Sequence, residues 1–555
     1  MNPAYANLAH ANAKTLTDTN PSALRRLQHS LSWRSNDNRN HARMQRLALD
    51  VGLHSEAAED ARPVILFRAS SGLLRLDQNA AFSLLTGWSL RLSGVPVIHF
   101  TCRSGMSRCT LGVDREDFSQ PPPCDPCIAQ SGRTTEGAEV NPFGYELEPD
   151  LSSQLAGLDL AGLSEFEYQG APLGRLALPS LRWILRRHNL ADDEPNRFLF
   201  REFILSAFNV SQHFSRLIDR VQPAAVLAFN GTFFPEAAAR WVCESRGIRV
   251  ITHEVGMQPF SAFFTEGEAT AYPFRIPDSF ELTPDEDGRL DAYLEERFRG
   301  NFTMAGIRFW PDMQGLDEDF RNKMARFTQI VPVFTNVVFD TSQVHANTLF
   351  PDMFAWLDAI MDAIRTHPET LFVIRAHPDE MRKHKESRES VAGWVEARGV
   401  EGLANVTFIG SQEYLSSYEL IQASKFVMVY NSSIGLEASL MGAPVLCGGR
   451  ARYTQIPCVF YPASPEAYRR LAEEFLASEQ IVVPPEFKRN ARRFLYYQFY
   501  KVSLPFDVYL EDHVLPGMVK LKPFGWEELL PERSPTLSTI VEGIRDGSEF
   551  VLSSS

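Results

Sequence analysis

Short apolar runs of strand length alternate with amphipathic stretches of helix length in the C-terminal half of the chain. The predicted strands are 330–334, 370–376, 406–409, 426–430 and 444–447, and the predicted helices are 353–366, 390–398, 414–423, a short one from 434, and 465–478. Regular alternation of strand and helix is typical of a parallel, doubly wound sheet. The pattern therefore predicts a Rossmann-like domain over residues 329–482.

The N-terminal half carries a similar pattern with longer interruptions. The predicted strands are 63–67, 95–100, 224–229 and 249–252, and the predicted helices are 79–92 and 235–246, with helical periodicity also present over 169–219. The strand, helix and strand between 224 and 252 form a βαβ unit. We therefore expect a second Rossmann-like domain over residues 61–260, and an α/β fold class for the whole chain.

Three segments lack this alternation. Residues 1–60 are a polar lead-in with one predicted helix at 22–31. Residues 261–328 are rich in proline and acidic side chains and are expected to connect the two domains. The tail, 483–555, contains an aromatic helix around 494–500, and its helices are expected to pack back across both domains.

Composition and charge argue against several classes of protein. The formal net charge is −14 and the pI is near 5.5, whereas proteins that bind nucleic acid carry a basic face. The sequence has no run of about 18 apolar residues of the kind that spans a membrane. Residues 1–50 are polar and lack the apolar core of a secretory signal. We therefore expect a cytoplasmic protein that binds no nucleic acid.

Four of the seven cysteines lie close together within 101–130: Cys102, Cys109, Cys124 and Cys127, with the spacing C-x6-C-x14-C-x2-C. In a cytoplasmic chain, clustered cysteines are expected to be thiols or metal ligands rather than disulfides. The short spacing of the last two allows both thiolates to bind one tetrahedral ion. We expect a cysteine-rich insertion in the N-terminal domain that holds a structural Zn²⁺. An iron–sulfur cluster and ordinary loop or core cysteines are the alternatives.

The predicted strand 426–430 leads directly into Asn431, Ser432, Ser433 and Gly435. In an open parallel sheet, hydroxyl groups, glycine and helix N–H groups at the carboxyl end of a strand can hold an anion. A phosphate-bearing ligand is therefore the first hypothesis for this turn. The alternative is a capped helix that binds nothing, because Ser and Asn are ordinary cap residues.

Three segments carry a resemblance to a known family: LFVIRAHP at 371–378, YNSSIGLEASLMGAPV at 430–445 and GGRARY at 448–453. Over residues 329–460 the chain resembles the bacterial capsule polysaccharide biosynthesis proteins, which include GT-B glycosyltransferases that use CMP-activated Kdo. The His-Pro and Ser-Ser pairs are also similar to motifs of CMP-sialic acid transferases and of teichoic-acid glycerophosphotransferases. The resemblance implies two Rossmann-like domains facing a cleft, a nucleotide-sugar donor, and a surface-polysaccharide or lipid-linked glycan acceptor.

A nucleotide-sugar donor leaves a phosphate, so its site must stabilise negative charge with donors that are already in place. We expect the hydroxyls of Ser432 and Ser433 to contribute, and His377, fixed by Pro378, to donate to the leaving phosphate or to the ribose. The predicted donor-side residues are Asn336, Arg375, His377, Pro378, Asn431, Ser432, Ser433, Gly435 and Glu437.

Structural roles remain alternatives for several of these residues. A histidine before proline can simply end a strand, and His367 in a predicted loop shows how common the dipeptide is. Arg375 either neutralises phosphate or forms a surface ion pair. Glu437 either holds a ribose or sugar hydroxyl, or only interacts with the dipole of its helix.

A base must also deprotonate the acceptor hydroxyl, and we expect it to come from the N-terminal domain. Glu254 is the first candidate, and Asn230 and His253 are expected beside it on the acceptor side. Asp287 is the second candidate, since sialyltransferase-like enzymes use an acidic-acidic-Gly motif for this role. The alternative for Asp287 is a solvated acidic loop.

Residues 329–482 contain no Asp-x-Asp pair of the kind that holds Mg²⁺ or Mn²⁺ against a diphosphate, so no catalytic metal is expected. Two other functions stay open. One is phosphotransfer from a CDP-alcohol, and the other is a non-catalytic, zinc-bearing scaffold that binds nucleotide sugar. Peripheral association with the inner face of the membrane is a further expectation.

Overall fold

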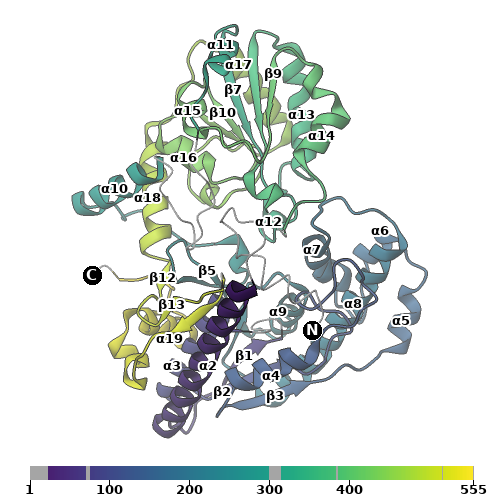
Figure 1. Ribbon diagram of the computed structural model, residues 1–555, viewed down its shortest axis with the longest axis vertical. Helices are drawn as coiled ribbons and strands as arrows, with labels where there is room; N and C mark the ends of the chain where they lie inside the picture. Colours follow the sequence, from purple (N-terminus) through teal and green to yellow (C-terminus); the bar gives the residue numbers. More distant parts are fainter. Residues whose placement is uncertain (1–22, 70–74, 299–313, 383–384, 516, 554–555) are drawn as a thin grey trace. The chain divides into compact units, whose positions relative to one another are not determined.

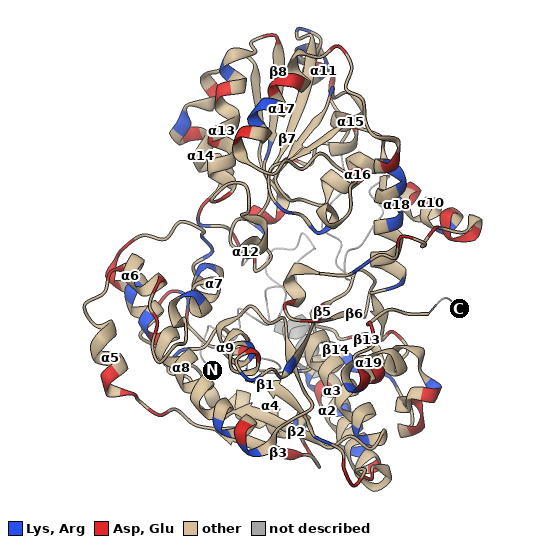
Figure 2. Ribbon diagram, turned by 180° about the vertical axis from the view of Figure 1, so that it is seen from behind, with Lys and Arg blue, Asp and Glu red and all other residues tan. Residues whose placement is uncertain are grey.

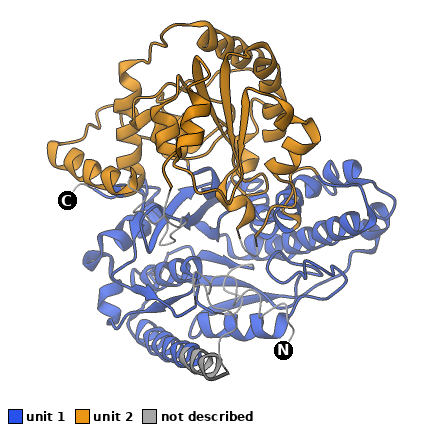
Figure 3. Ribbon diagram, turned by 45° about the horizontal axis from the view of Figure 1, so that its top comes forward, with its two compact units in different colours: residues 1–184, 190–272, 500–555 blue, residues 185–189, 273–499 orange. Residues whose placement is uncertain are grey.

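The chain folds into two compact units, and a computed structural model describes residues 23–69, 75–298, 314–382, 385–515 and 517–553. Unit 1 contains residues 1–184, 190–272 and 500–555, and unit 2 contains residues 185–189 and 273–499 (Figure 3). Each unit has its own main β-sheet and its own hydrophobic core. The predicted α/β class with parallel sheets is therefore confirmed.

The main sheet of unit 1 has seven strands in the order β12-β6-β5-β4-β1-β2-β3 (Figure 1). Their bounds are β1 (Val64–Arg68), β2 (Val97–Cys102), β3 (Glu139–Phe143), β4 (Ala225–Phe229), β5 (Arg249–Val255), β6 (Ser261–Glu266) and β12 (Leu504–Pro505). The first five strands are parallel, whereas β6 and β12 extend the sheet in antiparallel fashion. The parallel strands follow the order 3-2-1-4-5 of doubly wound folds.

Helices cover both faces of this sheet. They are α2 (Ala23–His54), α3 (Gln78–Leu92), α4 (Cys124–Thr134), α5 (Pro149–Leu155), α6 (Leu160–Ser164), α7 (Leu173–Leu185), α8 (Glu194–Val221), α9 (Phe234–Glu244) and α19 (Pro535–Asp546). Successive side chains of β1 point to opposite faces. Leu66 lies in the core formed with α2, α3 and α19. Phe67 instead packs against Phe100 of β2 and Phe214 of α8.

Three parts of unit 1 differ from the sequence-based expectations. The helix predicted at 22–31 continues to His54. Its Asn40 is held by β14 (Val519–Leu521): Nδ2 of Asn40 donates to Val519 O at 2.8 Å, and Oδ1 accepts from Leu521 N at 2.9 Å. The tail contributes β12 and a hairpin of β13 (Leu510–Asp512) with β14, besides helices. β6 lies in the segment expected to be a connection, and β3 was not predicted.

The sheet of unit 2 has five parallel strands in the order β11-β10-β7-β8-β9. Their bounds are β7 (Gln329–Phe334), β8 (Thr370–Arg375), β9 (Val406–Ile409), β10 (Val427–Val429) and β11 (Val445–Cys447). If these strands are numbered 1 to 5 in chain order, the sheet again has the order 3-2-1-4-5, read from β9 to β11. The direction of winding therefore reverses between β7 and β10. Each strand predicted in this region corresponds to an observed one, and β9 has both of its predicted bounds.

The helices of unit 2 also lie on both faces of its sheet. They are α10 (Pro284–Phe298), α11 (Glu318–Met324), α12 (Gln343–Ala346), α13 (Met353–Thr366), α14 (Val391–Arg398), α15 (Ser417–Gln422), α16 (Ile434–Leu440), α17 (Pro465–Ala477) and α18 (Pro485–Tyr500). Val333 and Ile374 share a core with α13, α14 and α17, whereas Val373 packs with α15 on the other face. α13 has its predicted bounds, and Asp352 caps it by accepting a hydrogen bond from Ala355 N.

Arginine side chains of α18 bind acidic residues of α10, and Figure 2 shows the basic and acidic positions of these two helices in blue and red. Arg492 pairs with Asp287 at 2.5 Å and with Asp291 at 2.7 Å, both on α10. Arg493 donates to the carbonyl oxygen of Phe280 at 2.7 Å. These contacts attach α10 and α18 to each other within unit 2. Within the described residues, the helices are too short or too polar to cross a membrane.

Candidate functional site

The carboxyl ends of β7, β8 and β10 lie side by side at one edge of the unit 2 sheet. Phe334 of β7 is in register with Arg375 of β8 and with Val429 of β10. The polar residues that follow these three strands are therefore brought together. This edge includes the reversal of winding between β7 and β10, and ligands of open α/β sheets bind at such a point.

Asn336 and Asn431 form a side-chain pair at this reversal. Nδ2 of Asn336 donates to Oδ1 of Asn431 at 2.7 Å, and Oδ1 of Asn336 accepts from Val337 N at 2.8 Å. These two bonds fix the orientation of both amides. Because Oδ1 of Asn431 faces Asn336, the NH₂ group of Asn431 points away from Asn336. Two donor-side residues predicted from distant parts of the sequence are thus in direct contact.

His377 follows β8 at the same edge, with a half-buried side chain. Its Nδ1 accepts a hydrogen bond from Asp379 N at 3.2 Å. Burial lowers the pKa of His377, and Arg375 lowers it further, while Asp379 and Asp340 oppose the shift. The ring is therefore neutral near pH 7, and because Nδ1 accepts, the proton is assigned to Nε2. His377 can donate one hydrogen bond from Nε2 to a ligand.

Arg375 ends β8 with its side chain buried in the protein, so the predicted alternative of a surface ion pair is wrong. Burial lowers the pKa of Arg375 to about 10, which leaves the guanidinium charged at neutral pH. Its Nη2 donates to Glu413 O at 3.4 Å. Pro378 begins a short 3₁₀ helix whose N-cap is His377. The strand end therefore carries a fixed positive charge beside a neutral imidazole.

Ser432 and Ser433 form the turn between β10 and α16. Ser432 is buried and Ser433 is exposed. The backbone carbonyl of Ser432 accepts a hydrogen bond of 2.9 Å from the hydroxyl of Tyr453. A Cβ atom on Gly435 would lie 2.2 Å from that same hydroxyl oxygen, so only glycine allows Tyr453 to hold the turn. Tyr453 is a positioning residue that reasoning from the sequence did not identify.

Glu437 is engaged in a buried cluster within unit 2. Its Oε1 accepts from Arg297 Nη2 at 2.6 Å, and its Oε2 accepts from the Tyr418 hydroxyl at 2.5 Å. The side chains of Arg297 and Glu437 are only 6% and 7% exposed. Both carboxylate oxygens therefore already have protein partners, which fits a structural role better than contact with a sugar.

The acceptor-side candidates of unit 1 do not all share one surface. Glu254 accepts from Asn230 Nδ2 at 3.5 Å and from its neighbour Val255 N at 2.9 Å. His253 precedes Glu254 within β5, so the two side chains point to opposite faces of the sheet. The His253 ring lies in the core among Phe82, Phe229 and Phe264.

His253 and Asn230 are both almost completely buried. Burial, helped by Arg68, lowers the pKa of His253 to about 3. Asn230 has a φ of 53° and caps the turn after β4 by accepting from Thr232 N at 2.8 Å. The structure thus places Asn230 against Glu254 but assigns His253 to the core, contrary to its expected place on the acceptor side.

Asp287, the second candidate base, lies on α10 rather than in an acidic loop. α10 belongs to unit 2, so Asp287 lies in the same unit as the donor-side candidates and not in the N-terminal one. Its carboxylate binds Arg492, as described above.

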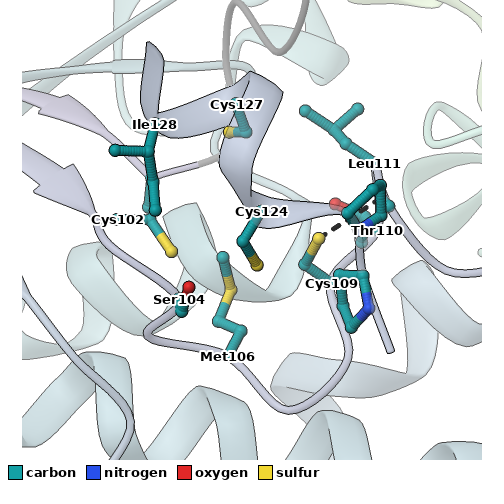
Figure 4. Close-up of a pocket in the computed structure, with 13 residues that line it drawn as sticks. Cys102, Ser104, Met106, Cys109, Thr110, Leu111, Cys124, Cys127 and Ile128 are labelled. Atoms are coloured by element: carbon teal, nitrogen blue, oxygen red, sulfur yellow. Dashed lines mark hydrogen bonds between the residues drawn. The ribbon is translucent and has the colours of Figure 1, made fainter. Parts of the chain in front are cut away.

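Of the four clustered cysteines, Cys102 is the last residue of β2, and the other three lie in the segment that connects β2 to β3 in unit 1. All four line one pocket (Figure 4). Burial raises the pKa of Cys102 and of Cys127 to about 12 and that of Cys109 to about 11, and neighbouring thiols push each in the same direction. In the described part of the chain, no three His, Cys, Asp or Glu side chains are arranged as a metal site.

Residues 307–470 match the family model described as "Capsule polysaccharide biosynthesis protein". The resemblance expected from the sequence is confirmed. No curated protein sequence matches the chain at a significant level.

Solved structures that match parts of the chain include two transferases named KpsC from Thermosulfurimonas dismutans. The β-Kdo 2,4-transferase is 12% identical and the match covers 51% of this chain and 80% of that one, with a TM-score of 0.32. The β-Kdo 2,7-transferase is 14% identical, with coverages of 57% and 86% and a TM-score of 0.30. A UDP-GlcNAc 2-epimerase from Neisseria meningitidis is 10% identical, with coverages of 78% and 98% and a TM-score of 0.24.

The capsule-biosynthesis region contains every donor-side candidate and none of the four cysteines. It also contains Arg450, an exposed cation that follows β11 at the same sheet edge and was not selected from the sequence. Its position within the GGRARY segment was the feature of the sequence that could have identified Arg450. Outside the region lie Asn230, His253, Glu254 and Asp287, so the match bears on the donor side only.

Proposed function

We propose that the protein is a glycosyltransferase of the GT-B type that moves a sugar from a nucleotide-activated donor to a surface-polysaccharide or glycan acceptor. One observation carries the proposal. Asn336, His377 and Asn431 follow the neighbouring strands β7, β8 and β10, where the winding of the unit 2 sheet reverses, and every donor-side candidate lies within residues 307–470, which match the capsule-biosynthesis model. A ligand site is expected at that position on physical grounds.

In this reaction, an acceptor hydroxyl oxygen bonds to the anomeric carbon of the donor sugar. The bond from that carbon to the donor phosphate oxygen breaks, and its electron pair stays on the phosphate. Negative charge therefore grows on the leaving phosphate and must be met by donors that are already oriented. We assign this task to His377 Nε2–H and to the hydroxyls of Ser432 and Ser433, with Arg375 supplying a buried positive charge nearby.

The proton of the acceptor hydroxyl passes to a carboxylate. Glu254 remains our proposed base, with Asn230 hydrogen-bonded to it. Asp287, whose carboxylate pairs with Arg492, remains the second candidate. The proposed donor is CMP-Kdo-like, as the family resemblance implies. The proposed location is the cytoplasm, with the option of peripheral attachment to the inner face of the membrane.

Thermal unfolding with CMP, CDP, UDP and GDP tests the donor site. A ligand at 100 times its Kd stabilises the folded protein by about 2.7 kcal/mol, so a bound nucleotide raises Tm measurably. We expect CMP to give the largest rise. His377→Ala should abolish most of that rise. His367→Ala is the matched control, because it alters the other His-Pro pair, which lies before β8 and whose ring binds Glu369 and Glu473.

An equal response of His377→Ala and His367→Ala would refute the site.

Measurement of turnover then distinguishes the three proposed functions. Release of free nucleotide together with transfer of sugar supports the glycosyltransferase, and His377→Ala should slow this step by about 100-fold or more. Transfer of a phosphoalcohol from a CDP-alcohol would identify a phosphotransferase. A nucleotide sugar that binds but stays intact with every acceptor tested would identify a scaffold.

A further inference from the structure

The end of β2 and the segment that follows it bring four thiols to one pocket of unit 1. Figure 4 shows Cys102, Cys109, Cys124 and Cys127 around this pocket, and Cys127 lies on the first turns of α4. All four cysteines are partly accessible. The remaining cysteines, Cys243, Cys447 and Cys458, are by contrast buried.

Two of these cysteines sit in turns of the same construction. Sγ of Cys102 accepts a hydrogen bond from Gly105 N at 3.2 Å, and Sγ of Cys109 accepts one from Gly112 N at 3.2 Å. In each turn the donor is the glycine three residues after the cysteine. Backbone N–H donors aimed at sulfur favour the thiolate over the thiol. Such turns prepare a sulfur atom to act as an anionic ligand.

Packing explains why both donors are glycines. A Cβ atom on Gly112 would lie 3.1 Å from Sγ of Cys109 and 3.0 Å from Cβ of Pro122. A Cβ atom on Gly105 would lie 2.3 Å from the ring of Phe143 at the end of β3. The turns are therefore closed tightly around the sulfur atoms and against the sheet. A loop that merely contained cysteines would not need this construction.

The second pair of thiols has a different but equally suitable support. Cys124 and Cys127 lie in the first turns of the 11-residue helix α4, three residues apart and so on neighbouring positions of one helix face. The start of a helix carries partial positive charge, which stabilises thiolates. The prolines at 121–123 lead directly into this helix. The first pair thus has backbone N–H donors at sulfur, and the second pair lies on one face of a helix start.

We propose that Cys102, Cys109, Cys124 and Cys127 bind one Zn²⁺ ion, which ties α4 to the end of β2. Four thiolates at about 2.3 Å in a tetrahedron are a closed, structural type of zinc site. In the described part of the chain the four cysteines line one pocket but are not placed at ligand distance, so binding of the ion requires the sulfur atoms to move toward one another. The ion would replace the thiol protons and hold the β2–β3 connection in place.

Metal analysis of the wild-type chain, purified without added zinc, is the first measurement. We expect about one zinc per chain, and no free native thiol among these four until a mercurial or a strong chelator removes the ion. Exchange for Co²⁺ should produce the intense near-ultraviolet absorption of thiolate-to-cobalt charge transfer. These measurements use the unaltered protein, so they do not depend on whether a cysteine variant folds.

Substitution then identifies the ligands. Cys127→Ser should lose the zinc and lower the Tm, whereas Cys243→Ser, at a buried thiol on α9 in the same unit, should keep about one zinc per chain. A wild-type protein without metal and with four titrating thiols would overturn the proposal. Unchanged zinc in Cys127→Ser would overturn it as well. Iron with inorganic sulfide in place of zinc would overturn the assignment of the ion.

Discussion

The amide of Asn336 donates a 2.7 Å hydrogen bond to Asn431, joining the ends of β7 and β10 at the reversal of the unit 2 sheet. The pair connects residues that are 95 positions apart. Because Asn336 also accepts from the backbone at Val337, the orientation of Asn431 is fixed from one side. We infer that this pair positions the Asn431 amide for the nucleotide, which makes the two residues one functional element.

Asn431→Asp should weaken nucleotide binding more than Asn431→Ala. The aspartate is similar in shape but replaces a donor with a negative charge, which repels the donor phosphate. A single hydrogen bond is worth about 0.5–1.5 kcal/mol, so the alanine variant should lose about threefold to tenfold in Kd. Titration calorimetry with the responding nucleotide measures both.

A double-mutant cycle with Asn336→Ala tests whether the two residues act together. Their effects on Kd should be less than additive, since either change disrupts the same pair. Fully additive effects, or an Asn431→Asp variant that binds like the wild type, would show that the pair does not contact the nucleotide.

The sequence was sufficient to predict the fold of unit 2 because local and tertiary signals agree there. The strands are apolar and buried, and α13 begins at Asp352, an ordinary cap residue. Unit 1 was harder. Residues 1–60 were expected to be a polar lead-in with a helix only at 22–31, yet Asn36 and Asn40 are buried in α2, and Asn40 is hydrogen-bonded to β14 from the other end of the chain. Such a long-range contact leaves no local signal.

The candidate site shows the same contrast. His377 and Ser432 were found because they follow apolar runs, and the carboxyl ends of parallel strands meet at one edge. The role of Glu437 could not be deduced, because its partner Arg297 lies 140 residues away. His253 was assigned to the wrong surface because β5 continues to Val255 and alternates faces through it. In each of these cases, strand pairing or a side-chain contact in the folded chain determined where the residue lies.

Glu437→Ala should destabilise unit 2 rather than act only on ligand binding. It would leave the buried guanidinium of Arg297 without its carboxylate, and breaking a buried pair costs about 3–5 kcal/mol. Urea unfolding measures the loss, with Glu396→Ala on the exposed side of α14 as the control. A stable variant with weakened sugar-nucleotide affinity would instead indicate that Glu437 contacts the donor.

Acid should destabilise unit 1 through His253 and His99. Burial lowers the pKa of both, that of His253 to about 3, whereas an unfolded histidine titrates near 6.5. Below pH 6.5 the unfolded chain therefore binds more protons than the folded one, and stability falls as pH falls. Each buried histidine contributes a loss of about 1.4 kcal/mol per pH unit in this range.

His253→Phe removes one of these titrating groups from a core that is already aromatic. Urea unfolding at pH 7.5 and pH 5.5, followed by hydrogen exchange in β4 and β5, should show a smaller loss of stability in the variant than in the wild type. The same loss in both proteins would mean that His253 is not the buried neutral group described above.

Transfer should need no divalent cation at the donor site. The donor-side residues offer hydroxyls, a neutral histidine and a buried arginine, and residues 329–482 have no Asp-x-Asp pair for Mg²⁺. Oriented dipoles and fixed charges can stabilise a leaving phosphate in place of an ion, and a CMP donor carries one phosphate fewer than a diphosphate. The initial rate should therefore stay within about twofold of its starting value after brief treatment with EDTA.

The control for this measurement is the metal content of the treated protein, since slow loss of the zinc proposed for the cysteine pocket would lower activity by destabilising the β2–β3 connection. A rate that falls at once, while the zinc content is unchanged, and that Mg²⁺ restores would show that a cation holds the donor. That result would favour a diphosphate donor such as a UDP-sugar over a CMP-sugar, because the second phosphate adds charge that the donor-side residues do not neutralise.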